Sequence, residues 1–168
     1  MSRDDNESPC PPLKRHAALH PLSREHMGGL ILARTLRRAA DGTVDDRKRA
    51  VDEFVARWTV ELRPHFDDEE RLLLPIIDRS ELRERLVEEH RALRERAAQC
   101  ERCASAVAQD AKAVRRLGVL LYDHIRWEER VLFEAIQRDH PAELASIVHE
   151  ALAIEDRRPG SRARRSLT

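Results

Sequence analysis

The sequence predicts an all-α protein, an up-down-up-down four-helix bundle with a short fifth C-terminal helix. Charged residues make up 37% of the 168 residues and glycine occurs only 5 times, a composition that favours helices with one solvated face over β-strands. Apolar residues recur at spacings of three and four along four long segments, as on the buried face of a helix. Short connections between these segments favour antiparallel neighbours.

The expected helices follow from these apolar stripes and from the residues that start and stop helices. They cover about residues 22–40, 45–76, 80–107, 110–138 and 141–156. Pro64 lies inside the second helix, where proline removes a backbone hydrogen bond and clashes one turn back, so we expect a bend just before His65. In the fourth helix, the spacing turns Val131 inward together with His124 and Glu128.

The length of the chain suits one domain with a single buried core. Residues 1–18 are polar and contain several prolines, so they are predicted to be a flexible leader before the bundle of residues 19–156. Residues 157–168 contain five arginines with glycine and serine, and are predicted to be a basic disordered tail.

The charge balance and the cysteines exclude several classes of function. The 31 basic residues equal the 31 acidic ones, so no net charge points to nucleic acid or to a membrane surface. No apolar run approaches the ~20 residues of a membrane span or resembles a signal peptide, and an odd count of three cysteines suits a reducing compartment. A cytoplasmic location is predicted. Cys100 and Cys103 form a Cys-x-x-Cys within a helix, where packing is favoured over redox chemistry.

A histidine precedes a glutamate by four residues at two places, His65 with Glu69 and His124 with Glu128. Residues four apart lie on the same face of a helix, so each pair can grip one metal ion or two adjacent ones. Upstream of each pair, the inward stripe of another helix carries a single histidine, His26 in the first copy and His90 in the second. This arrangement is an internal duplication, and it places six polar residues in one apolar core.

Burying four imidazoles and two carboxylates without a compensating ion would cost on the order of 1–3 kcal/mol for each unpaired group. A metal ion is therefore favoured, and a purely hydrogen-bonded network is the alternative. With each glutamate bridging, the six side chains supply about eight bonds, fewer than the roughly twelve of two octahedral ions, which leaves room for a bridging oxygen species and an open position. Imidazole with carboxylate suits iron, manganese or zinc, and a di-iron centre is the redox-active choice.

The choice of carboxylates follows from the repeated spacing. Glu69 and Glu128 are preferred over Asp68, Glu70 and Glu129, because only they hold the i+4 position in both copies. Glu25 and Glu89 lie about 100° around the helix from His26 and His90, so they are expected at the surface or behind the ligands.

The pattern resembles the hemerythrin family in its bacterial hemerythrin-like (HHE cation-binding) branch. The resemblance spans about residues 20–150 and is carried by Pro21–His26, His65-Phe66-x-x-Glu69-Glu70, Glu89-His90 and His124–Phe133. It implies a non-haem four-helix bundle with two iron ions in an Fe-O-Fe type centre, which binds or senses oxygen, nitric oxide, hydrogen peroxide, or iron or redox state. The implied metal ligands are His26, His65, Glu69, His90, His124 and Glu128.

Two departures separate the sequence from the oxygen carriers of that family. Leu86 stands where oxygen-carrying members have a second histidine, and Glu128 stands where they have aspartate. Four histidines with two glutamates resemble instead the ligand set of the iron-sulfur-repair di-iron proteins and of the eukaryotic iron-sensing hemerythrin-like domain. Redox or sensing use is therefore favoured over oxygen transport.

A binding or sensing module is predicted first, because the seam offers no acid or base besides the ligands, except for Tyr122. The alternative is a di-iron redox enzyme that removes peroxide or nitric oxide or aids iron-sulfur repair. A third possibility is a module that changes stability or partner on metal loading, through its arginine-rich tail. The expected partners are a small diatomic molecule or peroxide and an electron-transfer or regulatory protein, without nucleic acid or membrane. A monomer or weak homodimer is expected, because all ligands lie in one chain.

Overall fold

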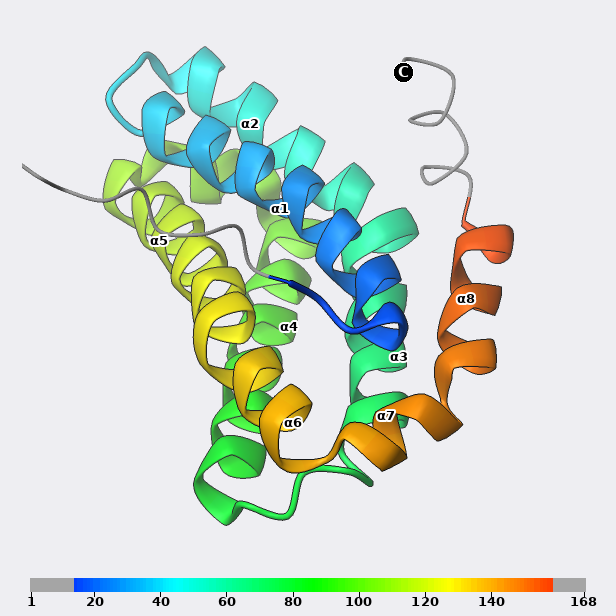
Figure 1. Cartoon of the computed structure of the whole chain (residues 1–168). Coiled ribbons are helices and arrows are strands. Elements are labelled where there is room, and N and C mark those ends of the chain that lie inside the picture. The colour runs from blue at the N-terminus through cyan, green and yellow to red at the C-terminus, as the bar shows by residue number, and fades with distance from the viewer. Residues whose placement is uncertain (1–13, 159–168) are drawn as a thin grey trace, which may run out of the picture.

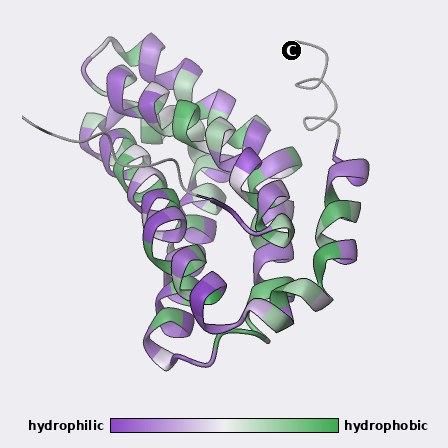
Figure 2. Ribbon diagram, in the orientation of Figure 1, coloured by the Kyte–Doolittle hydropathy of each residue, from purple (hydrophilic) through white to green (hydrophobic). Residues whose placement is uncertain are grey.

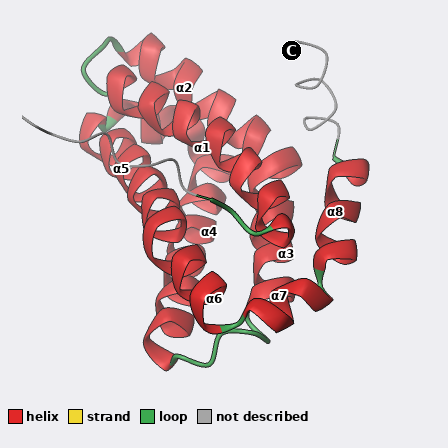
Figure 3. Ribbon diagram, viewed as in Figure 1, coloured by secondary structure: helices red, strands yellow, loops and turns green. Residues whose placement is uncertain are grey.

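The computed structural model describes residues 14–158, and every regular element within that range is a helix (Figure 3). The predicted all-α class is thus confirmed. Residues 1–13 and 159–168, which make up most of the expected leader and tail, lie outside the described residues, so the predicted domain boundaries stay a prediction. Among the described helices, none has a long enough apolar stretch to cross a membrane.

The described elements follow the expected segments closely, with the long second and fourth segments each divided by a π-helical turn. In order they are η1 (Ala17–Leu19), α1 (His20–Ala39), α2 (Val44–Arg57), η2 (Trp58–Leu62), α3 (Arg63–Leu73), α4 (Ser80–Gln109), α5 (Ala111–Trp127), η3 (Glu128–Leu132), α6 (Phe133–Asp139), α7 (Pro141–Ser146) and α8 (Val148–Arg157). Side chains cap the starts of α2 and α5: Thr43 forms a capping box with Asp46, and the Asp110 carboxylate accepts backbone N–H groups of α5.

Four long helical segments lie side by side: α1, α2 with α3, α4, and α5 with α6 (Figure 1). The helix α1 packs along α5 and α2, and α4 packs along the same two helices from the other side. Each segment carries both hydrophobic and hydrophilic residues (Figure 2), as expected for helices that bury one face. This arrangement fits a four-helix bundle.

The apolar core is divided into two clusters, with the predicted ligands between them. One cluster contains Phe66 and Leu93, and the other contains Leu72 and Leu86. His90 therefore lies between Leu86 of one cluster and Leu93 of the other along the same helix. The polar residues interrupt each helix at a matching height, which gathers them into a single layer across the core.

The two π-helical turns modify the expected helices near this layer. The turn η2 falls just before His65, where Pro64 predicted a bend, and Pro64 itself stands at the start of α3. The turn η3 was not expected, and it makes the prediction for Val131 wrong: this side chain is 45% exposed, whereas Leu132 is buried. A π-helical turn adds about one residue per turn, so the core-facing position moves on by one residue.

The expected single C-terminal helix is divided in two at Ile147, and its second part, α8, packs against η1 and α1. The expected third helix has a further irregularity at Cys103, whose backbone dihedral angles are not helical. Cys100 is buried and Cys103 is exposed, which agrees with a packing role for Cys100.

Candidate metal centre

The structure brings all six predicted ligands together from four helical segments. His26 comes from α1, His65 and Glu69 from α3, and His90 from α4, while His124 lies in the last turn of α5 and Glu128 begins η3. None of the six is more than 3% exposed. Their metal-binding role stays a prediction, but their convergence is a property of the fold.

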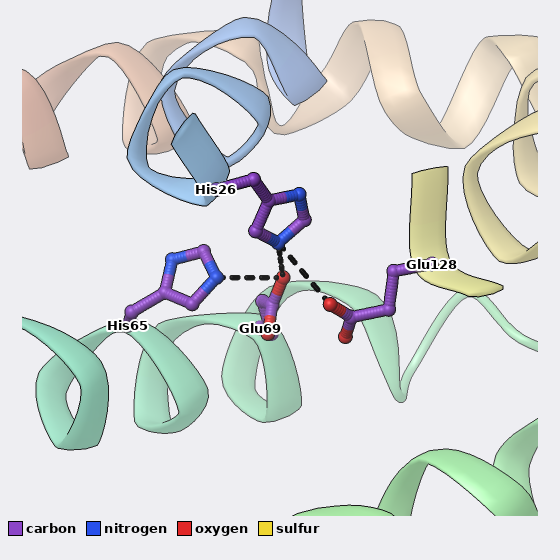
Figure 4. A group of neighbouring side chains, drawn as sticks. All are labelled: His26, His65, Glu69 and Glu128. Carbon is purple, nitrogen blue, oxygen red and sulfur yellow. Dashed lines mark ion pairs between the residues drawn. The ribbon is translucent and has the colours of Figure 1, made fainter. Parts of the chain in front are cut away.

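The first group contains His26, His65, Glu69 and Glu128, whose side chains point toward one another (Figure 4). His26 Nε2 lies 3.1 Å from Glu128 Oε2 and 3.4 Å from Glu69 Oε1. His65 Nε2 lies 3.1 Å from the same Glu69 Oε1. Ligand atoms about 2.1 Å from one cation and at right angles would lie about 3.0 Å apart, so these separations suit a metal ion.

The second group contains His90 and His124 with the same two glutamates. His90 Nε2 lies 3.4 Å from Glu69 Oε2 and 3.6 Å from Glu128 Oε1, and His124 Nε2 lies 3.3 Å from Glu128 Oε1. Each carboxylate thus turns one oxygen toward the first pair of histidines and its other oxygen toward the second pair. If each group held one metal ion, Glu69 and Glu128 could contribute to both ions.

The inward-facing atoms lack hydrogen-bond partners. Within residues 14–158, no hydrogen bond reaches the Nε2 atoms of the four histidines or the carboxylate oxygens of the two glutamates. Buried polar atoms are normally hydrogen bonded, because leaving one unpaired costs about 1–3 kcal/mol. Imidazole nitrogens and carboxylate oxygens are electron-pair donors that bind metal ions. Metal binding would therefore explain why these atoms have no hydrogen-bond partner.

The outer nitrogen of each imidazole, in contrast, is paired with a glutamate. The Nδ1–Oε distances are 2.6 Å for His26–Glu129, 2.8 Å for His65–Glu25, 2.8 Å for His90–Glu70 and 2.9 Å for His124–Glu89. An ionised carboxylate only accepts hydrogen bonds, so Nδ1 must carry the proton and Nε2 keeps its lone pair for a metal. Partners of this kind orient ligating histidines and raise their basicity.

The electrostatics of the cluster attract positive charge. Burial lowers the pKa of His90, but the neighbouring carboxylates of Glu128, Glu69 and Glu70 outweigh burial and raise the pKa to about 11. Burial also lowers the pKa of His26, but the carboxylates of Glu128, Glu129 and Glu69 raise it well above its ordinary value. For Glu69, burial raises the pKa, but the neighbouring imidazoles of His65, His26 and His90 hold it well below its usual range. Without a metal ion, Glu69 keeps its charge, and His26 and His90 take up protons.

Two of the outer carboxylates were not predicted from the sequence. The sequence places Glu25 and Glu89 at the surface or behind the ligands, but it predicts no role for Glu70 and Glu129. The available signal was a repeated Glu-Glu dipeptide, in which the first residue faces the centre and the second faces an imidazole of another helix.

Aromatic rings cover two of the imidazoles. Phe66 stacks on His90 with ring centroids 4.1 Å apart, and Phe133 stacks on His26 at 5.5 Å. Tyr122, the one additional acid that the sequence suggested, instead has its ring 5.2 Å from the guanidinium carbon of Arg37. The surroundings of the described ligands are thus apolar rings and carboxylates.

Comparison with known proteins gives one match. Residues 81–157 match the family model described as the hemerythrin HHE cation binding domain, and this range contains His90, His124 and Glu128. Neither the curated proteins nor the solved structures contain a match to the chain. His90, His124 and Glu128 of the His/Glu centre thus lie in a segment that is similar to the hemerythrin HHE cation-binding domain.

Proposed function

We propose that the protein binds two iron ions in the His/Glu centre and uses them to bind or sense a small diatomic molecule or peroxide. The observation that carries this proposal is the pair of overlapping ligand groups that share Glu69 and Glu128. Hemerythrin domains bind metal ions, and the unpaired Nε2 and carboxylate atoms are the donors that such ions need.

The donor set supports iron among the metals that suit imidazole and carboxylate. Each group offers two imidazoles and one oxygen from each of two carboxylates. Two iron ions held in this way would supply a redox-active centre with coordination positions left for a small ligand. The chain's own contribution is to orient the imidazoles through the outer glutamates and to surround the centre with apolar side chains such as Phe66 and Phe133.

Binding or sensing is favoured over catalysis because Tyr122, the proton donor that the sequence suggested, packs against Arg37. Removal of peroxide or nitric oxide, or a part in iron-sulfur repair, stays the alternative. Sustained turnover of peroxide or nitric oxide by the iron-loaded protein would establish that alternative.

The first experiment is the metal content of the protein purified without chelators, with optical spectra under nitrogen and after exposure to air, nitric oxide or peroxide. We expect about two iron ions per chain and a charge-transfer band that responds to at least one of these molecules. His65→Ala and Glu128→Ala should lose the band, whereas His149→Ala, which changes an exposed histidine, should retain it. Absence of bound metal, or metal unaffected by the first two substitutions, would overturn the proposal.

A further inference from the structure

Each outer glutamate that holds an imidazole also holds an arginine. The pairs are Arg15 with Glu129 (2.6 Å), Arg94 with Glu70 (2.6 Å), Arg85 with Glu89 (2.7 Å) and Arg158 with Glu25. Four histidine–glutamate–arginine series of contacts therefore run outward from the centre. The series that start at His26 and His65 belong to the first ligand group, and the other two belong to the second.

The arginines of the two groups come from different parts of the chain. Arg85 and Arg94 lie on α4, within the bundle, and their side chains are 48% and 33% exposed. Arg15 precedes η1 and Arg158 follows α8, and their side chains are only 7% and 10% exposed. The first ligand group alone thus depends on two end segments, residues 14–19 and 147–158, through ion pairs that solvent screens little.

The N-terminal segment is fixed by several contacts around Arg15. Its guanidinium donates to the Glu129 carboxylate and backbone oxygen and to Glu134. It also lies 5.4 Å from the ring centroid of Phe133, the ring that stacks on His26. The next residue, His16, donates its backbone N–H to Gln137 at 2.6 Å. Arg15 therefore contacts both of the groups that hold His26 in place.

The C-terminal segment is fixed in a similar way by Arg158. Its guanidinium donates to the carboxylates of Glu25 and Asp68 and to the backbone oxygen of Pro64, at 2.8 Å for Pro64. Glu25 accepts the Arg158 and His65 bonds at the same oxygen, Oε2. The helix α8 also packs against η1, so the two end segments contact each other beside the bundle.

We propose that Arg15 and Arg158 are positioning residues for the His26/His65 half of the metal centre, so that docking of the two end segments and loading of that half are coupled. The proposal rests on the metal centre proposed above, and it goes beyond it by making the two halves unequal. The His90/His124 half is independent of these segments.

The coupling follows from the hydrogen bonds. A carboxylate whose charge is balanced by a fixed guanidinium stays in one rotamer and keeps its imidazole aimed at the centre. When an end segment detaches, Glu129 or Glu25 loses its cation and its fixed position, and His26 or His65 loses orientation. By linkage, a metal ion that binds better with the segments docked must also hold them docked.

The test uses substitutions that isolate each half of the centre. In a His124→Ala background the first group remains complete, and in a His65→Ala background the second does. Arg15→Gln with Arg158→Gln should weaken Fe²⁺ binding, measured by anaerobic equilibrium dialysis, by about tenfold or more in the first background and less than about twofold in the second. Arg85→Gln with Arg94→Gln is the matched control and should show the opposite preference. Circular dichroism of each metal-free variant verifies its helix content.

A second measurement needs no arginine variant. Trypsin can cut the Arg15–His16 and Arg157–Arg158 bonds only when these end segments leave the bundle and enter the protease. Mass spectrometry should show both cuts slowed at least about threefold when wild-type protein is loaded with Fe²⁺. The protection should persist in His124→Ala and disappear in His65→Ala.

Equal loss of Fe²⁺ affinity in both backgrounds, or cleavage rates that do not depend on Fe²⁺, would overturn the coupling while leaving the metal centre intact. A wild-type protein that binds no Fe²⁺ would instead overturn the metal centre itself. If the double arginine variant does not fold, Arg15→Lys with Arg158→Lys replaces it, and the protease measurement on wild-type protein decides the question by itself.

Discussion

Removing the Glu69 carboxylate should abolish binding of both metal ions, whereas removing a histidine should abolish only one. Glu69 turns Oε1 toward His26 and His65 and Oε2 toward His90, so it belongs to both ligand groups. Glu69→Ala therefore takes one ligand from each ion. His124→Ala takes a ligand only from the second group.

The size of the effect can be worked out from linkage between binding and folding. An ion present at about 100 times its dissociation constant stabilises the folded protein by about 2.7 kcal/mol. In a domain of this size, 1 kcal/mol shifts Tm by about 2–4 °C, so each ion should raise Tm by about 5–10 °C. Wild-type protein should gain about 10–20 °C on loading, His124→Ala about half of that, and Glu69→Ala almost nothing.

Differential scanning calorimetry with and without metal, together with metal analysis of the same samples, measures these shifts. Glu70→Ala is the matched control, because Glu70 adjoins Glu69 but bonds only to His90 among the ligands. It should lower the affinity of the second group by about 10–100-fold and leave the first group unchanged. If Glu69→Ala retains one ion and half of the thermal shift, the carboxylate does not bridge and the reasoning is refuted.

The remaining predictions concern stability. In metal-free protein, the pKa of Glu129 is lowered to about 2 from 4.5, so its charge stabilises the fold above about pH 4.5 and this contribution disappears as the pH falls toward 2. Glu129→Gln should therefore remove on the order of 2–3 kcal/mol of that acid dependence in urea unfolding, and an unchanged pH profile would contradict this. Gly118→Ala should destabilise by about 1–3 kcal/mol in the same assay, because the new Cβ would lie 2.8 Å from the backbone oxygen of Ala33, which cannot turn aside. Gly28→Ala is its control, because the atom nearest to the new Cβ would be the flexible tip of the Arg57 side chain. The better helix propensity of alanine should leave stability unchanged or raise it by up to about 1 kcal/mol. A loss like that of Gly118→Ala would count against the packing argument.

Several elements show where sequence-based prediction succeeds and where it fails. The starts of the long helices were predicted within about two residues, because capping residues and prolines act locally. The inward position of Val131 was predicted from an α-helical period and is wrong, because the π-helical turn at Glu128–Leu132 changes the period locally. The turn before His65 had a proline as its signal, whereas the second turn has none.

The sequence by itself predicted that these six side chains face one core, and their metal binding stays a prediction. A histidine and a glutamate four residues apart share a helix face, and a histidine within an apolar stripe is expected to face the core. Because the motif occurs twice, each half of the centre receives the same number of histidines and glutamates. These are consequences of helix geometry and need no knowledge of how the helices pack.

Only the tertiary structure decided which carboxylate holds which imidazole. Glu25 bonds to His65 rather than to its neighbour His26, and Glu129 reaches across from the second copy to His26. Adjacent residues on a helix point about 100° apart, so a glutamate beside a ligand faces the neighbouring helix, whose identity depends on packing. Arg15 and Arg158, far from the ligand motifs in sequence, reach these glutamates only because the end segments fold back onto the bundle.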